Sequence, residues 1–279
     1  MPTAHPLHTH PDTPPRGGAQ PQKAAGATPS AGRGTFPQQT RPRHKWGMVV
    51  DLDRCTGCQA CVVACQAENN IPLNTESIYL QRRVIEWIRI ERYWEPNHEQ
   101  VRARYIPLMC QQCDNAPCEP VCPVYATYHN DQGLNVQVYN RCVGTRYCAN
   151  NCPYHARFFN FWQPVWPETL DNQLNPDVTV RWRGIMEKCT FCIQRLRRAQ
   201  REALREGRTL QDGEVVPACA QACPTDALVF GDLLDPNSRV SQLAKNKRAY
   251  KVIEDLGTGP NVIYLKKVDP YAPTADHSH

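Results

Sequence analysis

The chain has 279 residues and 15 cysteines, a content that indicates either a disulfide framework or a metal framework. Disulfide frameworks belong mainly to short secreted chains, whereas this sequence is long and starts without the basic and apolar segments of a signal peptide. The formal net charge of +5 is a modest excess that lies largely outside the cysteine-rich part, which argues against a nucleic-acid partner.

Residues 1–45 are rich in Pro, Gly, Ala and Gln and show no hydrophobic period. A segment of this composition cannot bury enough apolar area to offset the entropy of ordering it. We therefore expect a disordered arm, or an extended arm that lies on a neighbouring subunit. Histidines near both chain ends fit solvated tails better than metal sites; these are His5, His8, His10, His277 and His279.

Short strands and one surface helix are expected between the cysteine-rich segments. Residues 193–206 place apolar side chains among Arg, Gln and Glu, which predicts a helix, and Gly207 can end it in the left-handed conformation. Apolar and β-branched runs, some of them alternating with polar residues, predict the strands. The expected strands cover residues 47–52, 84–94, 134–138, 227–230 and 262–265.

The cysteines form four groups along the chain. They are group one (Cys55, Cys58, Cys61, Cys65), group two (Cys110, Cys113, Cys118, Cys122), group three (Cys142, Cys148, Cys152) and group four (Cys189, Cys192, Cys219, Cys223). Group one has the C-x2-C-x2-C-x3-C spacing of bacterial ferredoxins, except that Gln66 replaces the proline that follows. In that motif three cysteines hold one cubane cluster, and the fourth serves the other cluster of a pair.

Zinc is the main alternative for paired C-x2-C motifs. A tetrahedral zinc site needs only four ligands, so it does not explain a third cysteine at x2 and a fourth at x3, repeated along the chain. The sequence also lacks the C-x-x-C-H of covalent haem and the glycine-rich motifs of nucleotide sites. We therefore expect iron–sulfur clusters and electron transfer, with a structural zinc protein as the alternative from another class.

Group three departs from the motif at Thr145, where a cysteine is expected. A threonine hydroxyl is a hard, barely acidic donor and a poor substitute for thiolate on iron. Because a cube that lacks one thiolate often loses that iron, we expect a [3Fe–4S] cluster here. The alternative is a complete cube whose fourth iron binds water or the Thr145 oxygen.

Residues 44–268 resemble the four-cluster ferredoxin subunits of membrane-bound molybdopterin-type oxidoreductases, such as the polysulfide, dimethyl-sulfoxide and nitrate reductase iron–sulfur subunits. The four cysteine groups in this order, with the fourth split by a long insertion, carry the resemblance. A narrower resemblance is to the iron–sulfur part of the alternative complex III quinol oxidoreductase. It rests on residues 45–48, 61–72, 142–154 and 231–238.

The resemblance implies an α+β fold of two interleaved bacterial-ferredoxin-like dicluster modules with insertions. Residues 46–104 and 184–235 would form the first module, residues 105–183 the second, and residues 236–279 a C-terminal extension. The implied cofactors are three [4Fe–4S] clusters and one [3Fe–4S] cluster. The [4Fe–4S] ligands would be Cys55, Cys58, Cys61 and Cys223; Cys65, Cys189, Cys192 and Cys219; and Cys110, Cys113, Cys118 and Cys152. The [3Fe–4S] ligands would be Cys122, Cys142 and Cys148, with Thr145 at the vacant corner and not a ligand.

The resemblance also implies a chain without catalytic residues that relays single electrons from membrane quinol to a cytochrome. The implied partners are a polytopic quinol-binding membrane subunit, a large molybdopterin-enzyme-like subunit and haem c cytochrome subunits. The alternative is a subunit that links the quinone pool to a molybdopterin reductase or dehydrogenase. The expected location is peripheral on the cytoplasmic membrane, on the periplasmic face after export with a partner, or alternatively on the cytoplasmic face.

Overall fold

The computed structural model describes residues 44–96 and 101–268. The expected arm over residues 1–45 therefore lies outside the described residues, apart from His44 and Lys45, and so do the terminal histidines. Within the described ranges, no helix has the length and apolar character needed to cross a membrane.

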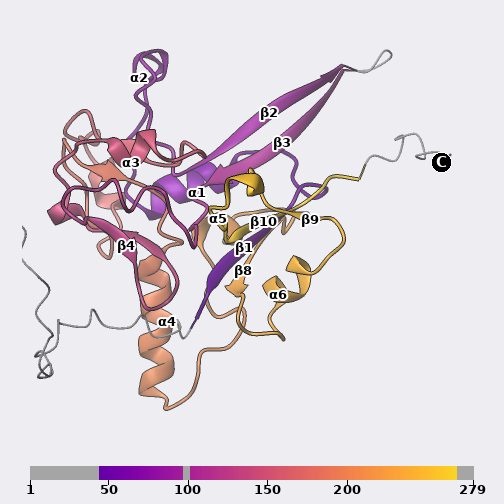
Figure 1. The fold of residues 1–279 in the computed structure, drawn as a ribbon. Coiled ribbons are helices and arrows are strands. Elements are labelled where there is room, and N and C mark those ends of the chain that lie inside the picture. Colours follow the sequence, from indigo (N-terminus) through magenta and orange to yellow (C-terminus); the bar gives the residue numbers. More distant parts are fainter. Residues whose placement is uncertain (1–43, 97–100, 269–279) are drawn as a thin grey trace, which may run out of the picture. The chain divides into compact units, whose positions relative to one another are not determined.

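A four-stranded sheet lies at the centre of the described residues, with the strand order β8-β1-β10-β9 (Figure 1). Its strands are β1 (Trp46–Asp51), β8 (Leu228–Asp232), β9 (Ala249–Tyr250) and β10 (Val262–Leu265). Strand β1 pairs antiparallel with β8 and parallel with β10, so that Met48 lies opposite both Phe230 and Val262. The strands expected over 47–52, 227–230 and 262–265 are thus confirmed, and the expected C-terminal extension supplies an inner strand.

Both faces of this sheet are buried, which explains why β1 and β10 are apolar at nearly every position. On one face, Val49 and Ile263 pack with Val240 of helix α6 (Arg239–Ala244). On the other face, Met48 and Tyr264 belong to the large core that also contains most of the cysteines. The sheet therefore forms one wall of the cysteine-rich core.

A long antiparallel hairpin precedes the second cysteine group. Strand β2 (Ile88–Pro96) pairs with β3 (Val101–Met109), and the two strands reach away from the central sheet (Figure 1). The strand expected over 84–94 is present but begins at Ile88. The base of the hairpin packs into the core through residues such as Ile88 and Met109. The boundary expected between the two modules, after residue 104, lies inside strand β3 of this hairpin.

The remaining elements are short, and most of them flank cysteine loops. Helices α1 (Ala60–Glu68), α3 (Tyr147–Asn150) and α5 (Ala218–Gln221) each contain cysteines, whereas α2 (Glu76–Leu80) does not. The small sheets pair β4 (Thr127–His129) with β5 (Asn135–Gln137) and β6 (Phe158–Phe159) with β7 (Met186–Glu187). Single 3-10 turns cover Tyr139–Arg141, Leu170–Gln173 and Glu254–Leu256. The strand expected over 134–138 is β5.

Helix α4 (Ile193–Arg205) is the longest of the described helices, and it confirms the helix expected over 193–206. Its buried side chains include Leu196 and Ala203, which lie on the face that packs against the core. Gly207 follows the helix with a φ of +65°, in the left-handed region that favours glycine. The mixture of helices and strands agrees with the expected α+β class.

Candidate iron–sulfur centres

Every one of the 15 cysteines is a free thiol, and ten of them are buried. A disulfide framework is therefore not present. The cysteines gather in four sets, which we call sites 1 to 4. Site 1 contains Cys55, Cys58, Cys61 and Cys223; site 2 contains Cys65, Cys189, Cys192 and Cys219; site 3 contains Cys110, Cys113, Cys118 and Cys152; site 4 contains Cys122, Cys142 and Cys148.

Site 1 is a cavity whose lining includes all four of its cysteines. The loop before α1 and the start of that helix supply three of them, and Cys223 comes from the turn after α5. Gly57 lies in this loop with a φ of +72°, and a Cβ atom there would lie 2.4 Å from the Tyr105 ring of β3. Only glycine fits such a position, so the hairpin and the cysteine loop pack directly on each other.

Site 4 is a second cavity, and Thr145 lines it together with the three cysteines. The structure thus brings Cys122 of group two beside the loop of group three. Gly144 has a φ of +71°, and a Cβ atom there would lie 2.2 Å from the carbonyl oxygen of Gly184. This close approach fixes the loop that carries Thr145 against a neighbouring segment.

Sites 2 and 3 lie in the interior, and all of their cysteines are buried. The electrostatic neighbours of Cys65 are Cys189, Cys192 and Cys219, so the last cysteine of group one lies with three cysteines of group four. The neighbours of Cys113 are likewise Cys110, Cys118 and Cys152.

The four sites follow one another in space. Cys219 of site 2 has Cys61 of site 1 as an electrostatic neighbour. Cys189 of site 2 in turn has Cys110 of site 3 as its strongest thiol neighbour. The Arg157 side chain donates to the Cys118 sulfur of site 3 and also interacts with the Cys148 thiol of site 4. The order is therefore 1, 2, 3, 4, and the outer sites contain the cysteines that are not fully buried: Cys55, Cys58, Cys122, Cys142 and Cys223.

Burial raises the pKa of several thiols, and the neighbouring thiols of the same site raise it further. The pKa of Cys61 and that of Cys113 are both raised to about 12. At neutral pH these groups stay protonated unless a cation binds them, and metal binding then releases the protons. The thiols are therefore arranged for ligation and not for nucleophilic chemistry.

Cys122 and Cys223 are exceptions, because both combine one local structure with only partial burial. Burial raises the pKa of each thiol, but several backbone N–H groups donate to the sulfur and outweigh it, so that the pKa is lowered. Each cysteine starts a C-P-x-x-A sequence, in which the alanine N–H reaches back to the sulfur, at 3.1 Å from Ala126 and 3.3 Å from Ala227. Such N–H···S bonds stabilise thiolate ligands of iron–sulfur clusters.

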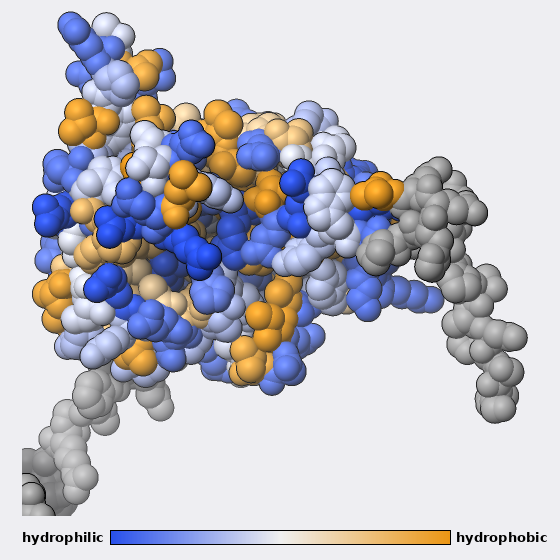
Figure 2. Space-filling view, turned by 90° about the horizontal axis from the view of Figure 1, so that it is seen from above, coloured by the Kyte–Doolittle hydropathy of each residue, from blue (hydrophilic) through white to orange (hydrophobic). Residues whose placement is uncertain are grey.

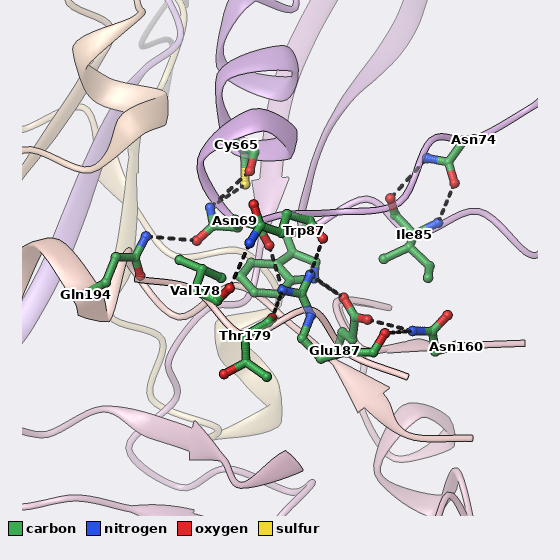
Figure 3. Close-up of polar contacts among 12 residues, drawn as sticks. Cys65, Asn69, Asn74, Ile85, Trp87, Asn160, Val178, Thr179, Glu187 and Gln194 are labelled. Carbon is green, nitrogen blue, oxygen red and sulfur yellow. Dashed lines mark hydrogen bonds and ion pairs between the residues drawn. The ribbon is translucent and has the colours of Figure 1, made fainter. Parts of the chain in front are cut away.

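The missing proline after Cys65 changes this arrangement at site 2. With Gln66 in its place, helix α1 continues to Glu68, and the Asn69 backbone N–H bonds to the Cys65 carbonyl oxygen at 3.1 Å. The Asn69 side chain donates to sulfur in place of a backbone N–H group. Its Nδ2 lies 3.5 Å from the Cys65 sulfur and 3.8 Å from the Cys192 sulfur. Its Oδ1 accepts from Gln194 at 3.2 Å, which orients the amide (Figure 3).

The spacing of the thiols fits clusters better than single ions. Four zinc ligands converge on one point at about 2.3 Å from the metal. In the part of the chain that the structure describes, no three His, Cys, Asp or Glu side chains are close enough to bind one metal ion. Instead, the cysteines of sites 1 and 4 line cavities. This arrangement fits cubane-type clusters, which hold their ligands apart at separate iron atoms.

Three residues beside the cysteines were not predicted from the sequence, namely Asn69, Arg157 and Lys188. Lys188 directly precedes a cysteine, and Arg157 follows a C-P sequence by four residues. Neither position is part of a ferredoxin motif, so the spacing alone gave no reason to select them.

Comparisons with known proteins agree with this geometry. The chain matches family models described as 4Fe-4S dicluster domains over residues 101–166 and 141–227, and as a 4Fe-4S binding domain over residues 46–67. The chain belongs to the family of iron–sulfur subunits of molybdopterin-type oxidoreductases. It is an electron-transfer subunit that is not catalytic by itself, and it binds 4Fe-4S clusters.

Its relatives include the iron–sulfur cluster-binding subunit of the menaquinone reductase of Nitratidesulfovibrio vulgaris, which is 48% identical over 80% of this chain and 89% of the relative. Iron–sulfur subunit 1 of the Hdr-like menaquinol oxidoreductase of Archaeoglobus fulgidus is 37% identical over 82% of this chain and 86% of the relative. The iron–sulfur subunit of the arsenate respiratory reductase of a Shewanella species is 33% identical over 79% of this chain and 95% of the relative.

Proposed function

We propose that this chain carries single electrons between a quinone-binding membrane subunit and a second redox subunit. The observation that carries the proposal is the row of four cysteine sites, in which both inner sites are buried and both outer sites are partly exposed. Electrons can then pass between subunits at the two ends while the middle of the row stays shielded from solvent. The relatives named as menaquinone reductase and menaquinol oxidoreductase subunits support the link to quinone.

Each site would hold one cluster, and a cluster supplies one-electron chemistry at a potential that the protein tunes. Sites 1, 2 and 3 would hold [4Fe–4S] clusters, and site 4 a [3Fe–4S] cluster with Thr145 at the vacant corner. Sites 1 and 2 both combine cysteines of groups one and four, whereas sites 3 and 4 combine groups two and three. This exchange of ligands supports two interleaved ferredoxin-like modules.

The second redox subunit would be a haem c cytochrome, as in the alternative complex III, in an assembly with a large molybdopterin-enzyme-like subunit. The four stretches over residues 45–48, 61–72, 142–154 and 231–238 support this choice. Relatives named as tetrathionate, arsenate and selenate reductase subunits favour a second candidate, in which the electrons serve a molybdopterin enzyme. Haem c in the purified native complex would support the first candidate, and bound molybdopterin the second.

The chain would be peripheral on the cytoplasmic membrane, and its membrane partner would provide the hydrophobic anchor. On the face shown in Figure 2, hydrophobic residues lie in small groups among hydrophilic ones, as expected for a surface that contacts partners and water. We propose the periplasmic side, reached by export with a partner. Protease accessibility in right-side-out vesicles would test the side.

The ligand sets can be tested with two serine variants of the native complex. Cys65→Ser should damage the cluster of site 2 and disturb that of site 1 less, because Cys65 lies with Cys189, Cys192 and Cys219. Cys223→Ser should damage site 1 first. Cluster-resolved paramagnetic resonance during a redox titration measures both effects. Loss of site 1 in Cys65→Ser and of site 2 in Cys223→Ser would contradict the proposed ligand sets, and wild-type protein without iron and sulfide would contradict the function.

A further inference from the structure

Two cationic side chains are buried between the cysteine sites. Arg157 is 5% exposed and Lys188 is 0% exposed. Among residues 44–96 and 101–268, neither one has a carboxylate within ion-pair distance. Arg181 is buried to the same degree but pairs with Glu187 at 2.9 Å. The two unpaired cations therefore need another source of negative charge.

The cost of burying a charge identifies that source. A cation moved into the protein interior without a partner loses several kcal/mol of hydration energy. A cluster bound by three or four thiolates carries a net negative charge, which becomes more negative on reduction. The chain thus places its unpaired buried cations where the proposed clusters would supply the missing anions.

Arg157 lies between site 3 and site 4. Its Nη1 donates to the Cys118 sulfur at 3.2 Å and to the Asn135 amide oxygen at 3.2 Å, and its Nη2 donates to Gln137. Its charge also acts on the Cys148 thiol of site 4. Its Nε is buried and has no hydrogen-bond partner among the described residues. The Arg157 guanidinium group therefore interacts with thiols of two sites, and its buried Nε can still donate to a further acceptor.

Lys188 lies between site 2 and site 3. Its Nζ donates to the Cys189 carbonyl oxygen at 2.9 Å, which holds the ammonium group beside site 2. Its charge acts on the Cys189 thiol of site 2 and on the Cys118 thiol of site 3. Site 3 thus has a buried cation on each side.

We propose that the positive charges of Arg157 and Lys188 raise the reduction potentials of the clusters on either side of each residue. This inference rests on the proposed ligand sets. A fixed positive charge stabilises the reduced cluster more than the oxidised one, because the reduced cluster is more negative. Site 3 is fully buried, and burial alone disfavours the additional negative charge of its reduced state. With a cation on each side, the cluster of site 3 can be reduced more easily, so that electrons can pass through it between sites 2 and 4.

The test is a redox titration of the native complex followed by paramagnetic resonance, with each signal assigned through the serine variants above. In Arg157→Gln, the potentials of sites 3 and 4 should fall while site 1 stays unchanged. In Lys188→Gln, the potentials of sites 2 and 3 should fall. Arg157→Lys keeps the charge but loses the fork of donors, so its shifts should be in the same direction and smaller. Arg248→Gln removes a partly buried cation that pairs with Asp51 and Asp53, and it should shift none.

The outcomes separate this inference from the proposed function. Wild-type protein that lacks iron and sulfide would overturn the function itself. Four clusters with unchanged potentials in Arg157→Gln and Lys188→Gln, or equal shifts at all four sites, would overturn only the inference. If Arg157→Gln does not assemble, Arg157→Lys and Lys188→Gln decide, because unchanged potentials in both would also overturn it.

Discussion

The side chain at position 145 determines how many thiolates reach site 4. Thr145 lines the cavity beside Cys122, Cys142 and Cys148, so it occupies the corner at which the ferredoxin motif places a cysteine. We propose that this corner holds no iron atom.

Thr145→Cys should convert site 4 from a three-iron to a four-iron cluster, because the added thiolate completes the ligand set. The paramagnetic signal of the oxidised three-iron cluster should disappear, and the iron content should rise by about one atom per chain. Thr145→Ser is the matched control, since it keeps a hydroxyl and should leave the spectrum unchanged. A three-iron signal that persists in Thr145→Cys would contradict the assignment.

At site 2, the Asn69 side chain replaces the backbone N–H···S bond that Cys122 and Cys223 receive. Asn69→Leu removes the N–H groups that face the sulfurs of Cys65 and Cys192, so the potential of site 2 should fall. Asn70→Leu is a control of similar burial, because the Asn70 amide donates to the carbonyl oxygens of Asn175 and Val178. The prediction fails if the two variants shift the site 2 potential equally.

The sequence indicates the candidate ligands by their spacing, but it does not indicate the residues that surround them. A cubane cluster fixes its ligands through local spacing, so the motifs could be recognised within short segments. Arg157 and Cys118 lie 39 residues apart, and Asn69 and Cys192 lie 123 residues apart. Such contacts depend on the packed fold, and no local sequence pattern predicts them.

At the scale of single elements, predictions succeeded where the apolar residues of a segment follow a clear pattern, along one face of α4 and at every position of β10. Helix α4 and strand β10 were predicted nearly to the residue. Strand β3 is not among the predicted strands, and it contains Pro107 although proline is rare within sheets. It is tolerated here because β3 belongs to a two-stranded hairpin, in which each strand has a free edge.

Helix α4 offers two leucines for a test of the packing. Leu196 is 0% exposed and Leu204 is 79% exposed, although both lie on the same helix. Leu196→Ala should lower the free energy of unfolding by about 2–5 kcal/mol, because it leaves a cavity in the core. Leu204→Ala should change it by less than about 0.5 kcal/mol. Thermal unfolding of the cluster-loaded complex would show the difference, and similar costs for both variants would contradict the helix orientation.

At the scale of the whole molecule, late segments of the chain pack beside early ones. The segment after α5 brings Cys223 beside group one, and β10 adds an inner strand next to β1. The motifs indicated how many sites to expect, but not which of them reach the surface. That distinction comes from the packing of loops around each site, which the spacing of cysteines does not determine.

Cys58 is exposed, and Cys55 and Cys223 are partly exposed. This exposure affects the order in which the clusters are lost in air. Dioxygen and peroxide attack iron–sulfur clusters and thiolate ligands most readily where solvent reaches them. Sites 1 and 4 should therefore decay first, and sites 2 and 3 should survive longer. Timed exposure to air, followed by cluster-resolved spectroscopy, should show two intact inner clusters in a protein that no longer conducts electrons from end to end. Simultaneous decay of all four clusters would contradict this order.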